Sequence, residues 1–194
     1  MQIELKLLYL ALAWGLYYFT HSFLALDTCK AWGRSRLGQK KYRLLYNLWS
    51  SLTILPLLYV TLRMEGVALW TNAWPLQLLG CVLILGGLLL GYRALNGYDL
   101  GEFSGLGQNS EEELPLVVAG LNAYVRHPLY SAILLLVFGL GLLRPLDTLW
   151  VTIGMSVVYI FWGSALEERK LIKRYGEAYQ SYRREVKRFI PYLL

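Results

Sequence analysis

The chain has 194 residues, a formal net charge of +6 and a mean hydropathy of +0.41. Hydrophobic residues make up 56% of it and charged residues only 16%, against about 25% in soluble domains. This composition argues against a soluble globular domain and indicates a membrane protein. Cys29 lies in a basic segment and Cys81 in an apolar one, so we expect no disulfide. Two histidines alone cannot build a zinc site, and we expect no metal.

Five apolar stretches are candidates for membrane-spanning helices, each of which needs about 20 residues. In chain order they are Leu7–Leu26, Leu44–Leu62, Trp74–Leu95, Leu129–Leu143 and Thr148–Leu166. The fourth is short and Arg144-Pro145 follows it at once, so the last two are predicted to form a tight helical hairpin. We interpret the first as a permanent span and not as a signal peptide, because it carries Glu4 and lacks a small-residue cleavage site.

The distribution of lysine and arginine predicts the orientation in the membrane. Six lie in Cys29–Arg43, two in Arg93–His127 and eight after Leu166, which places 16 on one side. Three, Lys6, Arg63 and Arg144, lie on the other. Because positive loops stay in the cytoplasm, we expect the N-terminus outside and the C-terminus inside. Charge that lies beside spans suits the lipid bilayer and its anionic headgroups as partners, and we expect no nucleic acid.

The fourth span is preceded directly by Arg126, His127 and Pro128. Proline is favoured in the first turn of a helix, so the helix is predicted to begin at Pro128. Arg126 and His127 then lie at a helix N-terminus, whose free N–H groups and dipole suit a carboxylate or phosphate. The alternative is that these two residues only mark the membrane interface.

The segment after the fifth span begins with Glu167 and Glu168 and continues with a periodic pattern. Steps of four and three predict one face of an amphipathic, cytoplasmic C-terminal helix, formed by Glu168, Ile172, Tyr175, Tyr179, Tyr182 and Val186. Such a helix could simply lie on the lipid headgroups. That alternative leaves two carboxylates at a negative membrane surface unexplained, so we expect them to pair with another group.

Polar residues inside the spans are further candidates. His21, near the inner end of the first span, is ionisable at membrane depth and is therefore a functional candidate. Asn47, Ser50 and Ser51 in the second span are better suited to hydrogen bonds between helices.

The stretches "GLNAYVRHPLY" and "EERKLIKRYGEAYQSYRREVKRFIP" resemble the isoprenylcysteine carboxyl methyltransferase and phospholipid methyltransferase superfamily. Its members are integral membrane enzymes that use S-adenosylmethionine, and the match covers residues 118–191. In the N-terminal half, "THSFLAL", "YRLLYN" and "YDLGEFSGLGQ" are similar to the branch with methanethiol S-methyltransferases and NnrU-type proteins.

The resemblance implies an all-α integral membrane methyltransferase with five transmembrane helices, the last two forming a hairpin, plus the C-terminal amphipathic helix. Residues 1–194 would form one domain in a prokaryotic inner membrane, with residues 118–191 as the cofactor-binding half. His127 would face the cofactor carboxylate, and Glu167 or Glu168 its amino group. Tyrosines would flank the adenine or the sulfonium. The implied cofactor residues are Val118, Gly120, Leu121, Tyr124, Val125, Arg126, His127, Pro128, Tyr130, Glu167, Glu168, Tyr175 and Tyr179.

The methyl acceptor is predicted from a departure from the family pattern. The isoprenylcysteine enzymes carry an arginine one turn before the glutamate pair, linked to a carboxylate substrate, whereas this chain has Gly163, Ser164 and Ala165. We therefore expect a small or lipophilic acceptor, a thiol or an amine. Glu168 is the candidate catalytic residue, and His21 is the candidate base for a thiol. A prenylcysteine-type carboxyl methyltransferase, a non-enzymatic membrane protein and a sterol-type reductase remain alternatives.

Overall fold

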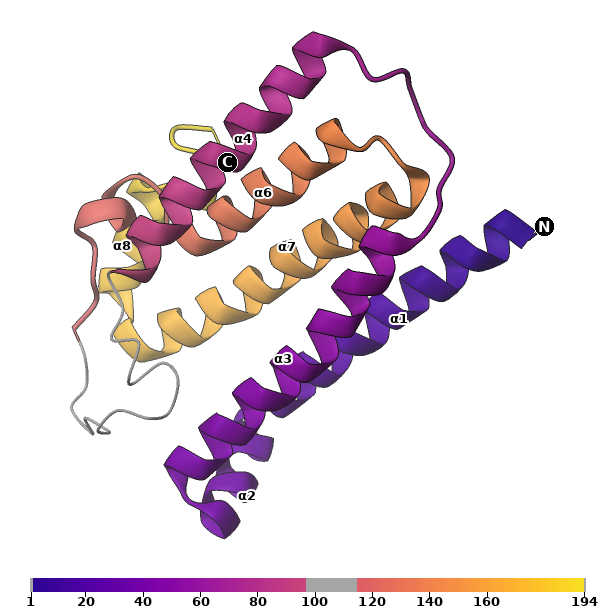
Figure 1. The fold of residues 1–194 in the computed structure, drawn as a ribbon. Helices are drawn as coiled ribbons and strands as arrows, with labels where there is room; N and C mark the ends of the chain where they lie inside the picture. Colours follow the sequence, from indigo (N-terminus) through magenta and orange to yellow (C-terminus); the bar gives the residue numbers. More distant parts are fainter. Residues whose placement is uncertain (1, 97–114, 194) are drawn as a thin grey trace. The chain divides into compact units, whose positions relative to one another are not determined.

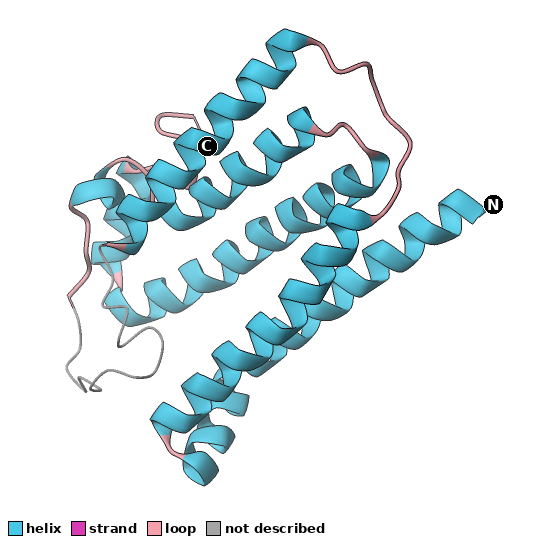
Figure 2. Ribbon diagram, in the orientation of Figure 1, coloured by secondary structure: helices cyan, strands magenta, loops and turns pink. Residues whose placement is uncertain are grey.

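The computed structural model describes residues 2–96 and 115–193, and the regular elements in them are helices (Figure 2). In chain order (Figure 1) these are α1 (Gln2–Leu24), α2 (Asp27–Leu37), α3 (Gln39–Arg63), α4 (Trp74–Leu95), the 3-10 helix η1 (Gly120–Ala123), α6 (Pro128–Leu143), α7 (Asp147–Tyr175) and α8 (Glu177–Glu185).

The described chain divides into two compact units. The first comprises residues 2–71 and 144–156, and the second comprises residues 72–96, 115–143 and 157–193. Helix α7 contributes to both. The single domain over residues 1–194 therefore stays a prediction, and each unit is described by itself.

Four of the described helices are long and apolar enough to cross a membrane: α1 from Glu4, α3, α4 and α7. Their surfaces are apolar as well as their interiors, since Leu12, Leu52 and Leu85 are 59%, 67% and 67% exposed. Continuous apolar surface on this scale is not tolerated in water. The chain is an integral membrane protein. Helix α6 is apolar but shorter, so the count of five spans stays a prediction.

The helix boundaries agree with the sequence pattern at two of the five spans. Helix α4 has the predicted bounds, and α6 begins at Pro128. Helix α7 continues past the predicted end of its span at Leu166 as far as Tyr175, so Glu167 and Glu168 lie within a helix. Helix α2 was not predicted, because its basic sequence indicated a headgroup segment.

The prediction of one continuous helix face after the fifth span is wrong. Gly176 has a φ of +58°, a conformation that glycine adopts at little cost, and it separates α7 from α8. The predicted face is therefore divided between two helices. Tyr179 and Tyr182 on α8 are nevertheless both buried, so the short helix α8 is amphipathic as expected.

In the first unit, polar side chains join α1 to its neighbours. The indole Nε1 of Trp14 donates to the Thr61 hydroxyl at 3.2 Å, and both residues are buried. Tyr18 and Ser156 share a hydrogen bond of 2.8 Å. Hydrogen bonds of this kind are the common polar contacts between membrane helices. At the start of α7, the Asp147 carboxylate accepts from the Val67 N–H at 2.9 Å.

In the second unit, α4 and α6 lie side by side (Figure 1). Glycines line the contact between them. A Cβ added at Gly80 would lie 2.9 Å from the carbonyl oxygen of Gly139, and one at Gly87 would lie 2.8 Å from Leu136. Small residues at such positions let two backbones approach closely inside a membrane. This contact supports the start of α6, where the candidate site lies.

Candidate functional site

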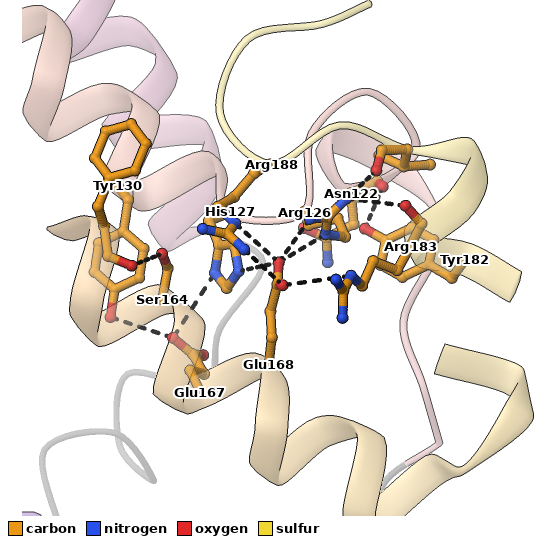
Figure 3. Close-up of polar contacts among 12 residues, drawn as sticks. Asn122, Arg126, His127, Tyr130, Ser164, Glu167, Glu168, Tyr182, Arg183 and Arg188 are labelled. Carbon is orange, nitrogen blue, oxygen red and sulfur yellow. Dashed lines mark hydrogen bonds and ion pairs between the residues drawn. The ribbon is translucent and has the colours of Figure 1, made fainter. Parts of the chain in front are cut away.

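Glu168 on α7 is the centre of the site, and the polar contacts drawn in Figure 3 converge on its carboxylate. Its side chain is almost completely buried. Its Oε1 accepts from Nε of Arg126 at 2.8 Å and lies 3.3 Å from Nε2 of His127. Its Oε2 accepts from Nη2 of Arg188 at 3.0 Å and lies 3.8 Å from Nε of Arg183. A buried carboxylate needs such partners, because losing water without them is very costly.

Arg126 joins three parts of the unit through a single guanidinium. Its Nε and Nη2 contact Glu168, and its Nη1 donates to the main-chain oxygens of Arg183 and Val186. Arginine suits this role because its planar group presents several fixed donors. The side chain is only 7% exposed, and its donors are occupied by the protein itself.

The segment after α8, residues 186–189, is held against the start of α6, and we call it the C-terminal strap. The Arg126 N–H donates to the Lys187 oxygen at 2.8 Å, and the His127 N–H donates to the Arg188 oxygen at 3.1 Å. The Ser131 hydroxyl donates to the Phe189 oxygen at 2.7 Å. These bonds use the His127 N–H at the N-terminus of α6, so that amide is not available to an anion.

Glu167, next to the buried Glu168, points to a different environment. Its side chain is 48% exposed, its Oε2 accepts from the Tyr130 hydroxyl at 3.2 Å, and the same oxygen lies 3.7 Å from Nδ1 of His127. The rings of His127 and Tyr130 are 5.4 Å apart. Glu167 thus presents an accessible carboxylate beside an aromatic ring, an arrangement that suits a cationic group.

The geometry gives the two glutamates different chemical possibilities. Both oxygens of Glu168 are occupied by side chains of the protein, whereas Glu167 has accepting capacity that faces outward. Of the two, Glu167 is the better placed for the amino group of a ligand. Glu168 is better placed to hold Arg126 and His127. The predicted cofactor roles of both residues and the predicted catalytic role of Glu168 stay predictions.

Tyr179 and Tyr182 of α8 pack against each other, with ring centroids 5.8 Å apart. The Tyr182 hydroxyl donates to the Asn122 oxygen at 2.6 Å. The Tyr179 hydroxyl is buried and has no hydrogen-bond partner among the described residues. Burial raises the pKa of each phenol to about 12, so both stay protonated at neutral pH.

The remaining predicted cofactor residues lie around η1 and the end of α7. Gly120 has a φ of +65°, which a residue with a side chain would adopt only under strain. Val125 and Pro128 are buried, Leu121 and Tyr175 are half-buried, and Val118 and Tyr124 are exposed. The structure therefore brings Arg126, His127, Tyr130 and the glutamate pair together. It places the exposed Tyr124 outside this contact network.

His21 lies in the first unit, within its own polar cluster. Its Nδ1 is 3.0 Å from the Ser50 hydroxyl, and its Nε2 is 2.9 Å from the Tyr46 hydroxyl. The Tyr17 ring stacks on it at 5.7 Å. The expectation that Ser50 serves helix–helix hydrogen bonding is confirmed, because the bond joins α3 to α1.

Three side chains of the site were not predicted: Ser131, Arg183 and Arg188. Tyr182 was predicted only as part of the amphipathic face. Arg188 is 20 residues from Glu168 in the chain, beyond the reach of any helical period. A buried acid needing cations was a signal that arginines would be found nearby, but it did not indicate which ones. The motif "YDLGEFSGLGQ" lies outside the described residues.

Comparison with curated proteins finds several relatives named methanethiol S-methyltransferase. The chain is 28% identical over 193 residues to the "Methanethiol S-methyltransferase" of Crocosphaera subtropica, covering 92% of this chain and 72% of the relative. It is 27% identical over 186 residues to "Methanethiol S-methyltransferase 1" of Bradyrhizobium diazoefficiens, covering 92% and 64%. A "Methanethiol S-methyltransferase" from a Pseudomonas species is 28% identical over 179 residues, covering 88% of this chain and 68% of the relative.

The chain therefore spans between 64% and 72% of the length of these relatives. No solved structure matches it. The family model described as "NnrU protein" matches residues 9–175, which is most of the chain, and the protein belongs to this NnrU family.

Proposed function

We propose that the protein is a membrane methyltransferase that uses S-adenosylmethionine to methylate a small thiol at sulfur. The observation that carries the proposal is the likeness to several proteins named methanethiol S-methyltransferase. The chemistry of the site also supports the proposal. A cationic methyl donor needs a carboxylate and an aromatic ring as partners, and the site offers these in Glu167, Tyr130 and His127.

The side chains of the site in the second unit fit this cofactor. The half-exposed Glu167 carboxylate would hold its amino group, and the face of Tyr130 would lie against its positive charge. The His127 imidazole, and not its occupied main-chain N–H, would meet the cofactor's carboxylate. Arg183, half-exposed and 3.8 Å from Glu168, provides a further cation near the site. When bound, the cofactor supplies an electrophilic methyl group on a sulfonium.

The residues of the chain would contribute by placing the reactants rather than by forming covalent bonds. A methyl transfer of this kind is an in-line displacement, and fixed geometry alone can supply about 7–11 kcal/mol of the acceleration. The network around Glu168 supports such placement, because it fixes Arg126 and His127 through several hydrogen bonds. Such fixed side chains meet the requirement that reactive groups be held by their neighbours.

The acceptor must lose a proton, since the thiolate is the reactive form of a thiol. We propose His21 as the base for this step. Its ring is supported by Tyr46 and Ser50, whose hydroxyls can both donate and accept, so the pair could relay a proton. Position 164 supports an acceptor without a carboxylate: Ser164 is fully buried and does not offer the cation that a buried carboxylate needs.

The orientation in the membrane is part of the proposal. The basic split places the N-terminus outside and the C-terminus in the cytoplasm of a prokaryotic inner membrane, with anionic lipid headgroups beside α2 and α8. On this orientation the strap and the glutamate pair face the compartment in which S-adenosylmethionine is made and used.

The test is a competition assay with the purified protein in nanodiscs and methyl-labelled S-adenosylmethionine. Small thiols, phospholipid amines and prenylcysteines are offered together, and the labelled products are separated. We expect the label on the thiols. Efficient methyl-ester formation on a prenylcysteine, without turnover of thiols, would overturn the acceptor class. Binding without transfer to any acceptor would favour a non-enzymatic role.

A further inference from the structure

The C-terminal strap carries two side chains that reach the candidate site. Phe189 is 3% exposed, and its ring lies 5.0 Å from Phe161 on α7 and 6.0 Å from His127. It thus packs against the imidazole on one side and α7 on the other. Together with the main-chain hydrogen bonds of the strap, this contact fixes the position of the Arg188 backbone.

Arg188 contacts both oxygens of Glu168. Its Nε donates to Oε1 at 3.3 Å and its Nη2 donates to Oε2 at 3.0 Å. A two-point contact between a guanidinium and a carboxylate sets the orientation of the carboxylate plane as well as its position. The oxygen Oε1 is also the atom 3.3 Å from Nε2 of His127. The orientation that Arg188 imposes on Glu168 is therefore transmitted to the imidazole.

We infer that Arg188 is a positioning residue, which acts through Glu168 to hold the His127 ring in the geometry that methyl transfer requires. The inference rests on the proposed function for its catalytic consequence, but the effect on the ring does not depend on it. Arg188 lies beyond residue 175, the last residue of the family match. The site is then completed by a segment outside the residues that the family model matches.

An alternative is that Arg188 only anchors the strap or neutralises charge. Its side chain is 25% exposed, so a surface role is physically possible. The two roles predict different results for the His127 ring. An anchor or a neutralising charge could be replaced by lysine, whereas a positioning residue that uses two donors of a planar fork could not.

The experiment compares three full-length proteins with labelled histidine in nanodiscs: unaltered, Arg188→Gln and Arg169→Gln. The chain has two histidines, so two ring resonances report His127 and His21 separately. Arg169 is the matched control, because it is an arginine next to Glu168 in sequence and its side chain is exposed. His21 lies in the first unit and reports on the folding of that unit, and circular dichroism shows whether the helices of the whole protein form.

We expect Arg188→Gln to shift the His127 resonance while that of His21 stays in place, and Arg169→Gln to shift neither. Losing a charge-assisted hydrogen bond should lower kcat about 10- to 150-fold, with a smaller change in KM for the cofactor. A fourth protein, Arg188→Lys, should show the same shift, because lysine lacks the planar fork. It replaces Arg188→Gln if that variant does not fold, and a resonance that lysine leaves in place would show that Arg188 only anchors the strap or neutralises charge.

An unchanged His127 resonance in the folded Arg188 variant would overturn the inference, and so would an equal shift in Arg169→Gln. Absence of methyl transfer in the unaltered protein would instead overturn the proposed function. The resonance would still decide the role of Arg188, so the two failures are distinguishable.

Discussion

Glu168 illustrates how one buried charge can organise a site. Its carboxylate is surrounded by Arg126, His127 and Arg188 at 3.3 Å or less. A buried ion pair adds little net stability over an apolar core, but removing one partner leaves the others buried and uncompensated. The residue is therefore expected to be much more sensitive to substitution than an exposed glutamate on the same surface.

The first prediction compares Glu168→Gln with Glu177→Gln. The first change leaves buried guanidinium groups without a counter-charge and should cost on the order of 3 kcal/mol in unfolding free energy. The second removes an exposed pair with Arg184 and should cost less than about 1 kcal/mol. Unfolding in detergent, followed by circular dichroism, measures both. Equal stability of the two variants would contradict a central role for Glu168.

The second prediction concerns the tyrosines of α8. Tyr182→Phe loses the hydrogen bond to Asn122 and should lower the unfolding free energy by about 1 kcal/mol. Tyr179→Phe removes a buried hydroxyl without a partner among the described residues, so stability should be unchanged or higher. The same unfolding assay checks the pair. A larger loss in Tyr179→Phe would reveal a partner for that hydroxyl.

Local sequence rules predicted the residues at the start of α6 but not the arginine of the C-terminal strap that completes the site. Pro128 marks the start of α6 and so placed Arg126 and His127 correctly, because helix N-termini have a local signature. Arg188 could not be found in this way, because its contact with Glu168 depends on the turn at Gly176 and on the path of the strap. Contacts set by the return of the chain have no period that a sequence pattern displays.

At the scale of elements, hydropathy predicts where a helix enters an apolar medium better than where the helix ends. The bounds of α4 agree because proline and tryptophan at its start and a polar stretch of sequence after its end coincide with the limits of the span. Helix α7 runs on to Tyr175, since the charged residues after Leu166 are themselves good helix formers. Helix α2 was missed because hydropathy does not mark a short basic helix.

The third prediction tests the contact between α4 and α6. Gly80→Ala would bring a Cβ within 2.9 Å of the Gly139 oxygen, forcing the helices apart at a cost of about 1–3 kcal/mol. Gly86→Ala is the matched control, because nothing lies within 4 Å of its added Cβ. That change should be neutral or stabilising by up to about 1 kcal/mol. Equal effects in unfolding assays would argue against close packing here.

At the scale of the whole molecule, the chain combines apolar helices with charge concentrated beside them. The fourth prediction is its orientation. In a background with Cys29→Ser and Cys81→Ser, Glu65→Cys should react with an impermeant thiol reagent in intact cells, and Tyr192→Cys should not. Both should react after the cells are opened. Labelling of Tyr192→Cys in intact cells would reverse the orientation and remove the cytoplasmic placement of the site.

The most direct test of the account is transfer of a labelled methyl group from S-adenosylmethionine to methanethiol by the protein in nanodiscs. We expect labelled dimethyl sulfide from the unaltered protein. His127→Ala should weaken cofactor binding about 10- to 150-fold, with lower product at limiting cofactor. A folded protein that binds no S-adenosylmethionine and forms no labelled sulfide above a protein-free control would contradict the central claim.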